Sequence, residues 1–325
     1  MIPGEQRILV TGASGFIGSA LVPALKAAGY ATRCAVRRLP EQRSHDAETA
    51  AVGDIDGTTE WAEALRDVET VVHLAARTHV LRETASDPLA AYRRVNVDGT
   101  RQLATQAAAA GVRRLVFLSS IKVNGERTFA RPYTEDDTPQ PEDAYGITKW
   151  EAEQALRAIE RETGLQVVVL RPPLVYGPGV KGNFLRLMKL VSRGWPLPLA
   201  SVRNQRSLVY LGNLVEAILA CIKTPAAAGR TYLVSDGHDL STPDLVRALA
   251  ECLGVPPHLY PFPPSLLMLG ASLVGKREEA ARVLGSLQVE SSRIRKELGW
   301  QPPHTMEEGL TETARWFRLV RGLGM

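Results

Sequence analysis

A tyrosine and a lysine four residues apart are the first side chains in this chain that could act together in catalysis. Tyr145 and Lys149 begin a stretch, 145–163, whose pattern predicts a helix, and residues four apart lie on one helix face. A phenol with a pKa near ~10 is a poor base at neutral pH unless a nearby cation favours its ionised form. Lys149 would supply that cation, although the same spacing also arises by chance on amphipathic helices.

A serine upstream of this pair could hold a substrate oxygen while Tyr145 passes the proton. Ser119 and Ser120 follow a run of apolar residues, 115–118, that predicts a buried strand. Doubly wound sheets place their functional sites at the carboxyl ends of the strands. Ser120 is therefore expected to lie at the same edge of the sheet as Tyr145 and Lys149.

A glycine-rich turn near the N-terminus predicts a dinucleotide site. It reads Thr11-Gly12-Ala13-Ser14-Gly15-Phe16-Ile17-Gly18 and joins a predicted strand to a predicted helix, as the dinucleotide-binding fingerprint requires. Gly12 permits the tight turn, Gly15 lets backbone N–H groups approach a pyrophosphate, and Gly18 allows close packing of helix on strand. The helix N-terminus then faces the phosphate charges. We expect this turn, with Ser14, Phe16 and Ile17, to hold NAD or NADP; a plain glycine-rich turn is the alternative.

The choice between the two cofactors depends on the end of the second predicted strand. An NAD site usually places an acid there for the ribose 2′-hydroxyl, whereas this chain has Arg37 and Arg38, whose cations suit a 2′-phosphate. NADP is therefore slightly favoured over NAD, with solvated surface arginines as the alternative. We place Asp54 and Ile55, after the third predicted strand, at the adenine; an Asx turn is the other role open to Asp54.

Taken in order along the chain, these motifs resemble the extended short-chain dehydrogenase/reductase family, and within it the nucleotide-sugar epimerases, dehydratases and reductases. The resemblance covers nearly the whole chain. It also rests on three further segments, which are His73-Leu74-Ala75-Ala76, Asn96-Val97-Asp98-Gly99-Thr100 and Arg171-Pro172-Pro173-Leu174-Val175-Tyr176-Gly177-Pro178.

The resemblance implies a role for each motif. Ser120 and Tyr145 would handle the proton, and Lys149 would bind the nicotinamide ribose and lower the tyrosine pKa. The loops after two strands would line the cofactor with Leu74, Ala75, Ala76, Pro172 and Pro173. Asn96 would brace the active-site helix, with a plain helix N-cap as the alternative.

The part of the chain after residue 172 resembles the segments that hold the substrate diphosphate in nucleotide-sugar members of the family. Asn183, Arg206 and Arg282 would contact the phosphates, because an amide and a planar guanidinium suit phosphate oxygens. His79 and Lys122 would lie near the sugar. Each of these side chains is also open to a plain surface role.

Two departures from the family pattern bear on the reaction. Ile121-Lys122 stands where the 4,6-dehydratases carry Asp-Glu, and dehydration needs an acid and a base beyond the tyrosine, so that activity is not expected. Asn124 stands where the family often has tyrosine, near the sugar pocket.

We therefore expect an enzyme that transfers hydride at C4 of a nucleotide-linked hexose, with Tyr145 as acid/base. A 4-keto-sugar reductase and a UDP-hexose 4-epimerase, in surface-polysaccharide sugar biosynthesis, are equally open. A sensor or scaffold that binds NAD(P) without turnover is the alternative from another class. Relatives commonly dimerise through two helices that include 145–163, so we expect a homodimer.

These residues need an α/β fold with a doubly wound parallel sheet to bring them together. Strands are predicted at 8–10, 31–36, 71–74, 115–118 and 167–170, and helices at 17–28, 96–110 and 145–163. Near-continuous apolar strands with helical crossovers indicate a parallel sheet covered on both faces. We expect a Rossmann domain over 1–171 and a smaller substrate-binding lobe over 172–325, from which about 206–236 returns to the sheet.

Composition is that of an ordinary globular protein. The 325 residues are 45% apolar and 23% charged, and the net charge of +4 is not gathered into runs, so no nucleic-acid partner is expected. The three cysteines are far apart with no histidine at metal spacing, which predicts reduced thiols, no metal site and a cytoplasmic protein. No signal peptide is expected at the N-terminus. The apolar stretch 264–274 is too short to span a bilayer, so we expect no stable membrane insertion and a buried helix there, with membrane contact as the alternative.

Overall fold

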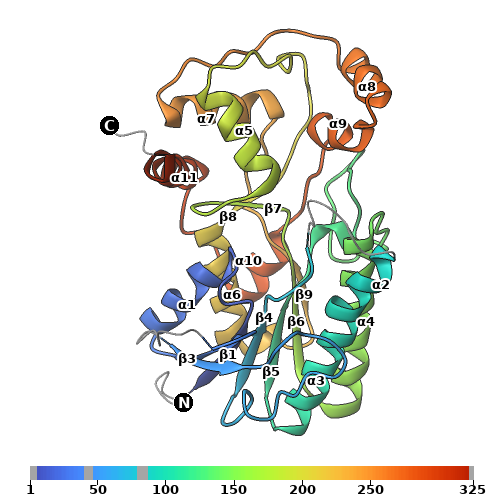
Figure 1. Cartoon of the computed structure of the whole chain (residues 1–325), viewed down its shortest axis with the longest axis vertical. Helices are drawn as coiled ribbons and strands as arrows, with labels where there is room; N and C mark the ends of the chain where they lie inside the picture. The colour runs from blue at the N-terminus through green and yellow to red at the C-terminus, as the bar shows by residue number, and fades with distance from the viewer. Residues whose placement is uncertain (1–5, 40–46, 79–86, 322–325) are drawn as a thin grey trace.

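The computed structural model describes residues 6–39, 47–78 and 87–321, and its centre is a parallel seven-stranded sheet. The strand order is β3-β2-β1-β4-β5-β6-β9 (Figure 1). The strands are β1 (Arg7–Thr11), β2 (Ala31–Val36), β3 (Glu48–Ala51), β4 (Thr70–His73), β5 (Arg114–Leu118), β6 (Gln166–Arg171) and β9 (Thr231–Leu233). The chain winds one way from β1 to β3 and the other way from β4 onward, so the predicted doubly wound Rossmann fold is confirmed, with its switch point between β1 and β4.

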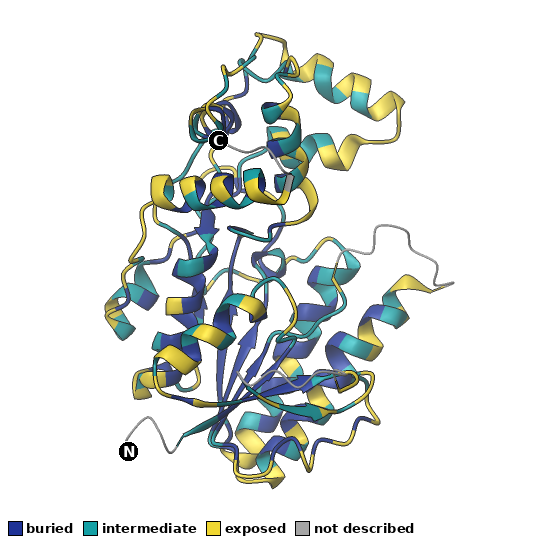
Figure 2. Cartoon of the chain, turned by 60° about the vertical axis from the view of Figure 1, so that its left-hand side comes forward, coloured by how far each residue is buried: buried dark blue, intermediate teal, exposed yellow. Residues whose placement is uncertain are grey.

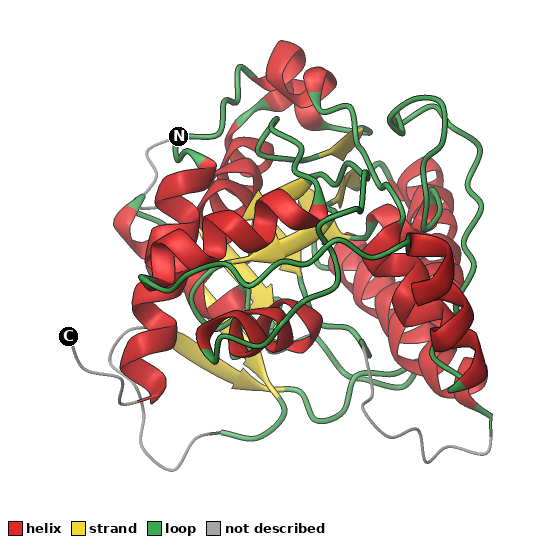
Figure 3. Ribbon diagram, turned by 90° about the horizontal axis from the view of Figure 1, so that it is seen from above, coloured by secondary structure: helices red, strands yellow, loops and turns green. Residues whose placement is uncertain are grey.

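Helices cover both faces of this sheet (Figure 3). One face carries α1 (Gly18–Ala27), α6 (Leu211–Lys223) and α10 (Ser292–Leu298), and the other carries α3 (Gly99–Ala109) and α4 (Ala144–Thr163). Side chains of β1 alternate between the two layers, because Ile8 and Val10 pack toward α1 while Leu9 packs toward α3. The central strands β1, β4, β5 and β6 are almost entirely buried, as their dark blue colour in Figure 2 shows, whereas no residue of the edge strand β3 is buried.

The helix expected at 96–110 begins earlier than predicted. It opens with α2 (Pro88–Arg93), capped by Asp87, and continues through a π turn, η2 (Arg94–Asp98), into α3. The N-cap role considered for Asn96 is therefore wrong, because Asn96 lies inside the π turn and is buried. A π turn adds a residue to one helical turn and is frequent at functional sites.

The second lobe is built around a two-stranded parallel sheet, β7 (Leu174–Tyr176) and β8 (Leu208–Tyr210). Its helices are α5 (Gly182–Ser192), α7 (Thr242–Leu253), α8 (Pro264–Leu273), α9 (Arg277–Leu284) and α11 (Met306–Arg321). Side chains of α5, α7 and α11 form one apolar core with β7 and β8. Figure 1 shows this lobe beyond the carboxyl ends of the large sheet, and β9 returns from it to pair with β6.

The apolar helix α8 is exposed, so the predicted burial of this segment is wrong. None of its residues is buried, and Leu266, Leu269 and Leu273 expose 51%, 58% and 81% of their surface. Its apolar composition predicted a buried helix, but among the described helices and strands α9 alone packs closely against it. Within the described ranges, no helix is long and apolar enough to cross a membrane.

Candidate active site

The glycine-rich turn lies at the carboxyl end of β1 and is packed too closely to admit side chains at two positions. Gly12 has a φ of +69°, and a Cβ there would lie 2.8 Å from the Ala75 backbone nitrogen. A Cβ on Gly18 would lie 2.3 Å from the Gly12 carbonyl oxygen. Ser14 and Gly15 remain exposed beside the N-terminus of α1. A tight, exposed turn at a helix N-terminus fits a dinucleotide pyrophosphate.

The neighbouring loops at this sheet edge are held by a buried hydrogen-bond chain. The Thr11 hydroxyl contacts His73 Nδ1 at 2.6 Å and accepts from the Ala75 N–H at 3.1 Å. This chain fixes the loop after β4 against the end of β1. The predicted cofactor-lining residues follow β4 and β6 directly, with Leu74, Ala75 and Ala76 half-buried and Pro172 and Pro173 buried.

The residues predicted for the adenosine half lie at the ends of β2 and β3. Arg37 Nε contacts Asp54 Oδ1 at 2.7 Å, and both side chains are about three-quarters exposed (76% and 74%). The structure thus pairs two residues that we had assigned to separate parts of the cofactor. Arg38 is exposed beside them, and Ile55 packs against Gly99, where a Cβ would meet its side chain at 2.6 Å.

The catalytic candidates come together where β5 ends beside the first turns of α4. Ser120 caps the short helix η3 (Ile121–Val123), and its Oγ accepts the Lys122 N–H at 3.2 Å. That contact uses an acceptor position of the hydroxyl and leaves its O–H able to donate. Tyr145 is the second residue of α4, Lys149 lies one turn further, and η3 packs on this helix.

Burial sets the ionisation of the two titratable members. Lys149 is almost fully buried over the Phe117 ring, 4.1 Å from the ring centroid, and burial lowers its pKa to about 7 against the opposing charge of Glu153. Burial also raises the pKa of Tyr145 above its usual value, and the charge of Asp143 adds to this. Desolvation therefore dominates the pKa of Tyr145 in this structure, and the lowering of that pKa by Lys149 stays a prediction.

Asn96 connects three segments around the catalytic helix. Its amide donates to Thr148 Oγ1 at 3.1 Å and to the Arg77 carbonyl at 3.0 Å, and its Oδ1 accepts the Arg77 N–H at 2.8 Å. Thr148 lies on α4 between Tyr145 and Lys149. The side chain thus braces α4 against the loop after β4.

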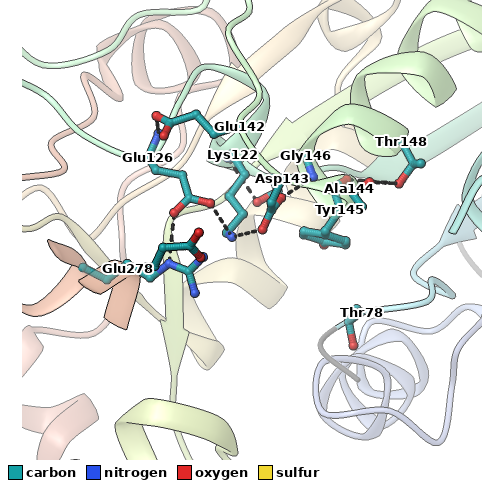
Figure 4. A network of polar contacts seen from close by, with 12 residues as sticks. Thr78, Lys122, Glu126, Glu142, Asp143, Ala144, Tyr145, Gly146, Thr148 and Glu278 are labelled. Atoms are coloured by element: carbon teal, nitrogen blue, oxygen red, sulfur yellow. Dashed lines mark hydrogen bonds and ion pairs between the residues drawn. The ribbon is translucent and has the colours of Figure 1, made fainter. Parts of the chain in front are cut away.

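A cluster of charged side chains lies beside Tyr145, near the start of α4 (Figure 4). Lys122 contacts Asp143 and, at 2.8 Å, Glu126; Arg282 Nε contacts the second Glu126 oxygen at 2.9 Å. Arg206 donates to the Arg282 carbonyl at 2.6 Å. A cavity of about 130 Å³ is lined by Glu126, Arg127, Glu142, Asp143, Glu278, Ala281 and Arg282.

The structure brings only some of the predicted substrate residues together. Lys122, Arg206 and Arg282 meet in this cluster. Asn183 lies exposed in the first turn of α5, and His79 lies outside the described residues.

Two carboxylates in the cluster were missed by the sequence analysis. Asp143 caps α4, because its Oδ1 accepts the Gly146 N–H at 2.8 Å, and an aspartate just before a helical stretch is a recognisable cap signal. Glu126 carries no comparable signal, because its partner Arg282 is far away in sequence.

A buried ion pair beneath the site was also missed. Arg171 and Glu153 are 3% and 2% exposed, and their side chains form hydrogen bonds of 2.5 and 3.0 Å. Ser119 donates to Glu153, and Arg171 donates to Asn124 Oδ1 at 3.0 Å. Asn124, which is itself buried, thus supports Arg171.

Comparison with known proteins places the chain among enzymes of one family. The sequence pattern of the NAD dependent epimerase/dehydratase family matches residues 8–235. A UDP-glucose 4-epimerase of Vibrio cholerae is 45% identical over 324 residues, 98% of each chain. An N-acetyl-alpha-D-glucosaminyl-diphospho-ditrans,octacis-undecaprenol 4-epimerase of Escherichia coli O157:H7 is 29% identical over 330 residues, 96% of this chain and 95% of that protein.

A solved structure agrees with the sequence relatives. MoeE5 in complex with UDP-glucuronic acid and NAD is 27% identical and has a TM-score of 0.78, with 97% of this chain and 99% of that one covered. The resemblance read from the motifs is confirmed, and the chain belongs to the NAD dependent epimerase/dehydratase family of extended short-chain dehydrogenase/reductase enzymes.

Proposed function

We propose that this chain is a UDP-hexose 4-epimerase. The observation that carries the proposal is the packing of η3, which Ser120 caps, on α4, whose first turns carry Tyr145 and Lys149. The 45% identical relative bears the name UDP-glucose 4-epimerase, which favours epimerisation over the reductase reading. Ile121 and Lys122 stand where the 4,6-dehydratases carry the Asp-Glu pair that dehydration uses, which argues against that reaction.

In this proposal the protein residues move one proton and hold one oxygen. Ser120 donates its O–H to the sugar O4, and the Tyr145 phenolate takes the O4 proton and later returns it. Lys149 provides a cation on the same helix face that favours the phenolate. Bound cofactor would supply the hydride acceptor and, after the keto sugar has turned over, the hydride donor to its other face.

The test is turnover without added cofactor. Purified protein is expected to release NAD on denaturation and to interconvert UDP-glucose and UDP-galactose with no nicotinamide nucleotide in the buffer. Tyr145→Phe should lose about 10²–10⁴-fold in kcat and retain the nucleotide. Strict dependence on added NADPH, with reduction of a 4-keto sugar, would instead establish the reductase.

The cofactor preference has its own measurement. NAD is the cofactor bound to MoeE5, and the preference for NADP that Arg37 and Arg38 indicate stays a prediction for this chain. Among the described residues Arg37 forms an exposed ion pair with Asp54, and such pairs are worth under about 1 kcal/mol, so a 2′-phosphate could displace the carboxylate. Replacing both arginines by serine should weaken NADP binding far more than NAD binding; equal effects on the two Kd values would remove the preference.

A second candidate substrate is a sugar carried on a polyprenyl diphosphate, and the exposure of α8 favours it. The Escherichia coli O157:H7 relative is named for such a substrate. In this chain, residues 259–275 contain no acidic or basic side chain and expose the α8 leucines, and Lys276 and Arg277 follow. An exposed apolar surface of this kind can mark a contact with a membrane, and the next helix, α9, brings Arg282 to the active-site cluster.

Flotation with vesicles of phosphatidylcholine and phosphatidylglycerol separates the two substrates. The second candidate requires that the protein floats, that the triple change Leu266→Gln, Leu269→Gln and Leu273→Gln abolishes flotation, and that this variant loses activity only on polyprenyl diphosphate N-acetylhexosamine. Wild-type protein that stays in solution and acts on UDP-hexoses alone would exclude it.

A further inference from the structure

Lys122 connects the segment that carries Ser120 to the segment that carries Tyr145. It lies two residues after Ser120, and its ammonium contacts the carboxylate of Asp143, which lies two residues before Tyr145. The side chains of Lys122 and Asp143 are 16% and 31% exposed, so this contact is partly shielded from bulk solvent. A shielded ion pair acts more strongly on its neighbours than an exposed one.

The segments that carry Lys122 and Asp143 are closely packed. A Cβ on Gly146 would lie 2.8 Å from the Lys122 carbonyl oxygen, so the first turn of α4 rests directly on the Lys122 backbone. Asp143 is held independently, because one carboxylate oxygen caps α4 while the other contacts the lysine. Asp143 therefore stays beside Tyr145 whether or not the lysine is present.

The remaining charges around Tyr145 come from three elements. Lys149 lies on α4, the phenol of Tyr92 lies on α2, and Glu126 follows η3. Glu126 is matched by Arg282 of α9, in addition to Lys122. The other carboxylates of the cluster have arginine partners, because Glu142 pairs with Arg127 and Glu278 with Arg282. Removal of Lys122 would therefore take away the cation that contacts Asp143 and leave its negative charge unmatched next to Tyr145.

This excess would oppose the step that the tyrosine must perform. Burial and then the Asp143 charge raise the pKa of the Tyr145 phenol. Burial also acts to raise the pKa of Asp143, but the hydrogen bond and charge of Lys122 and the Gly146 N–H together lower it. Figure 4 shows the Tyr145 ring beside the Lys122–Asp143 pair. A phenolate must form in the active site for the O4 proton to be taken.

We propose that Lys122 is a positioning residue that neutralises Asp143 and so makes the Tyr145 phenolate accessible during the reaction. This proposal rests on the proposed function, in which Tyr145 is the acid/base. It assigns Lys122 a role through Tyr145, in place of the direct sugar contact that the sequence indicated.

A double-mutant cycle over Lys122→Met and Asp143→Asn tests the proposal. Asparagine is as good a helix cap as aspartate, so Asp143→Asn removes the charge and keeps the helix start. The ionisation of Tyr145 is read in two ways, as the pH dependence of kcat and as the tyrosinate absorbance that disappears in Tyr145→Phe.

We expect Lys122→Met to raise the Tyr145 ionisation by about one pH unit and to lower kcat about tenfold at neutral pH, with KM nearly unchanged. Asp143→Asn should lower the ionisation by a similar amount, and the double variant should return close to wild type. Lys122→Arg should behave like wild type, because it keeps the cation.

The proposal is overturned if Lys122→Met leaves the Tyr145 ionisation unchanged, or if it raises KM and Asp143→Asn does not restore activity. If Lys122→Met does not fold, an unshifted Tyr145 ionisation in Asp143→Asn overturns it equally. The absorbance titration needs no turnover. Shifts as expected in a protein without epimerase or reductase activity would refute the proposed function and support the charge pairing.

Discussion

The His73 imidazole is fully buried between Thr11 and Thr100, with contacts of 2.6 and 3.0 Å to their hydroxyls. Its ring stacks on Phe117 with centroids 5.7 Å apart. Burial, and then the charge of Lys149, lowers the pKa of His73 to about 3. A histidine that stays neutral and has both nitrogens engaged serves the structure of the cofactor edge and not proton transfer.

The His73 pKa predicts how stability changes with pH. An unfolded histidine has a pKa of ~6.5. Below that pH, the histidine therefore binds a proton in the unfolded chain but stays neutral in the folded chain. The contribution of His73 to the free energy of unfolding is complete above about pH 6.5 and falls by up to about 1.4 kcal/mol per pH unit below it.

Urea unfolding of wild type and His73→Gln at a series of pH values below about 6.5 measures this. The variant keeps hydrogen-bonding groups but cannot titrate, so its stability should fall less steeply toward acid. Equal slopes for the two proteins would show that His73 is accessible to protons in the folded state.

At the scale of elements, the first helix and its turn depend on an approach that only glycine allows. Gly18→Ala would place a methyl group 2.3 Å from the Gly12 oxygen, so α1 must move away from the turn. We expect a loss of about 1–3 kcal/mol in stability, together with weaker binding of NAD or NADP.

Gly270→Ala is the matched control, because no atom lies within 4 Å of a Cβ there and the residue is also helical. It should be neutral or stabilising by up to about 1 kcal/mol. Calorimetric titration with nucleotide and urea unfolding compare the pair. Unchanged nucleotide affinity in Gly18→Ala would mean that the turn is not the pyrophosphate site.

At the scale of the whole molecule, Asp236 ties the large sheet to the second lobe. It follows β9 and accepts hydrogen bonds from the Tyr176 hydroxyl at 3.0 Å, the Tyr210 N–H at 2.9 Å and the Asn213 amide at 2.8 Å. These partners lie on β7, β8 and α6. One carboxylate thus holds three elements that lie between the cofactor edge and the substrate lobe.

Asp236→Asn should destabilise the protein by about 2–3 kcal/mol, because an amide N–H₂ would face groups that can only donate or already donate. Asp136→Asn, at a carboxylate that is 77% exposed, should change stability by under about 1 kcal/mol. Thermal unfolding of both variants provides the comparison. Similar melting temperatures would show that the lobes are held elsewhere.

The spacing of residues close in sequence was enough to predict the fold class and the catalytic candidates. The glycine turn, the Tyr145–Lys149 pair and the alternating strands and helices depend on residues close in sequence, so they identified the fold class and the catalytic candidates. The start of the helix at Pro88 was missed although Asp87 and Pro88 form a local helix-start signal, whereas no local signal marks the π turn that places Asn96 inside the helix.

The tertiary structure alone determined the contacts between distant segments and the exposure of the apolar helix α8. Arg282 meets Glu126 and Lys122 meets Asp143 because packing brings α9, η3 and α4 together. The exposure of α8 likewise depends on which elements cover it, and its composition alone predicted burial. The sequence therefore determined which groups perform the chemistry, whereas the packing determined the charges that surround Tyr145, because electrostatic interactions depend on distance and burial in space.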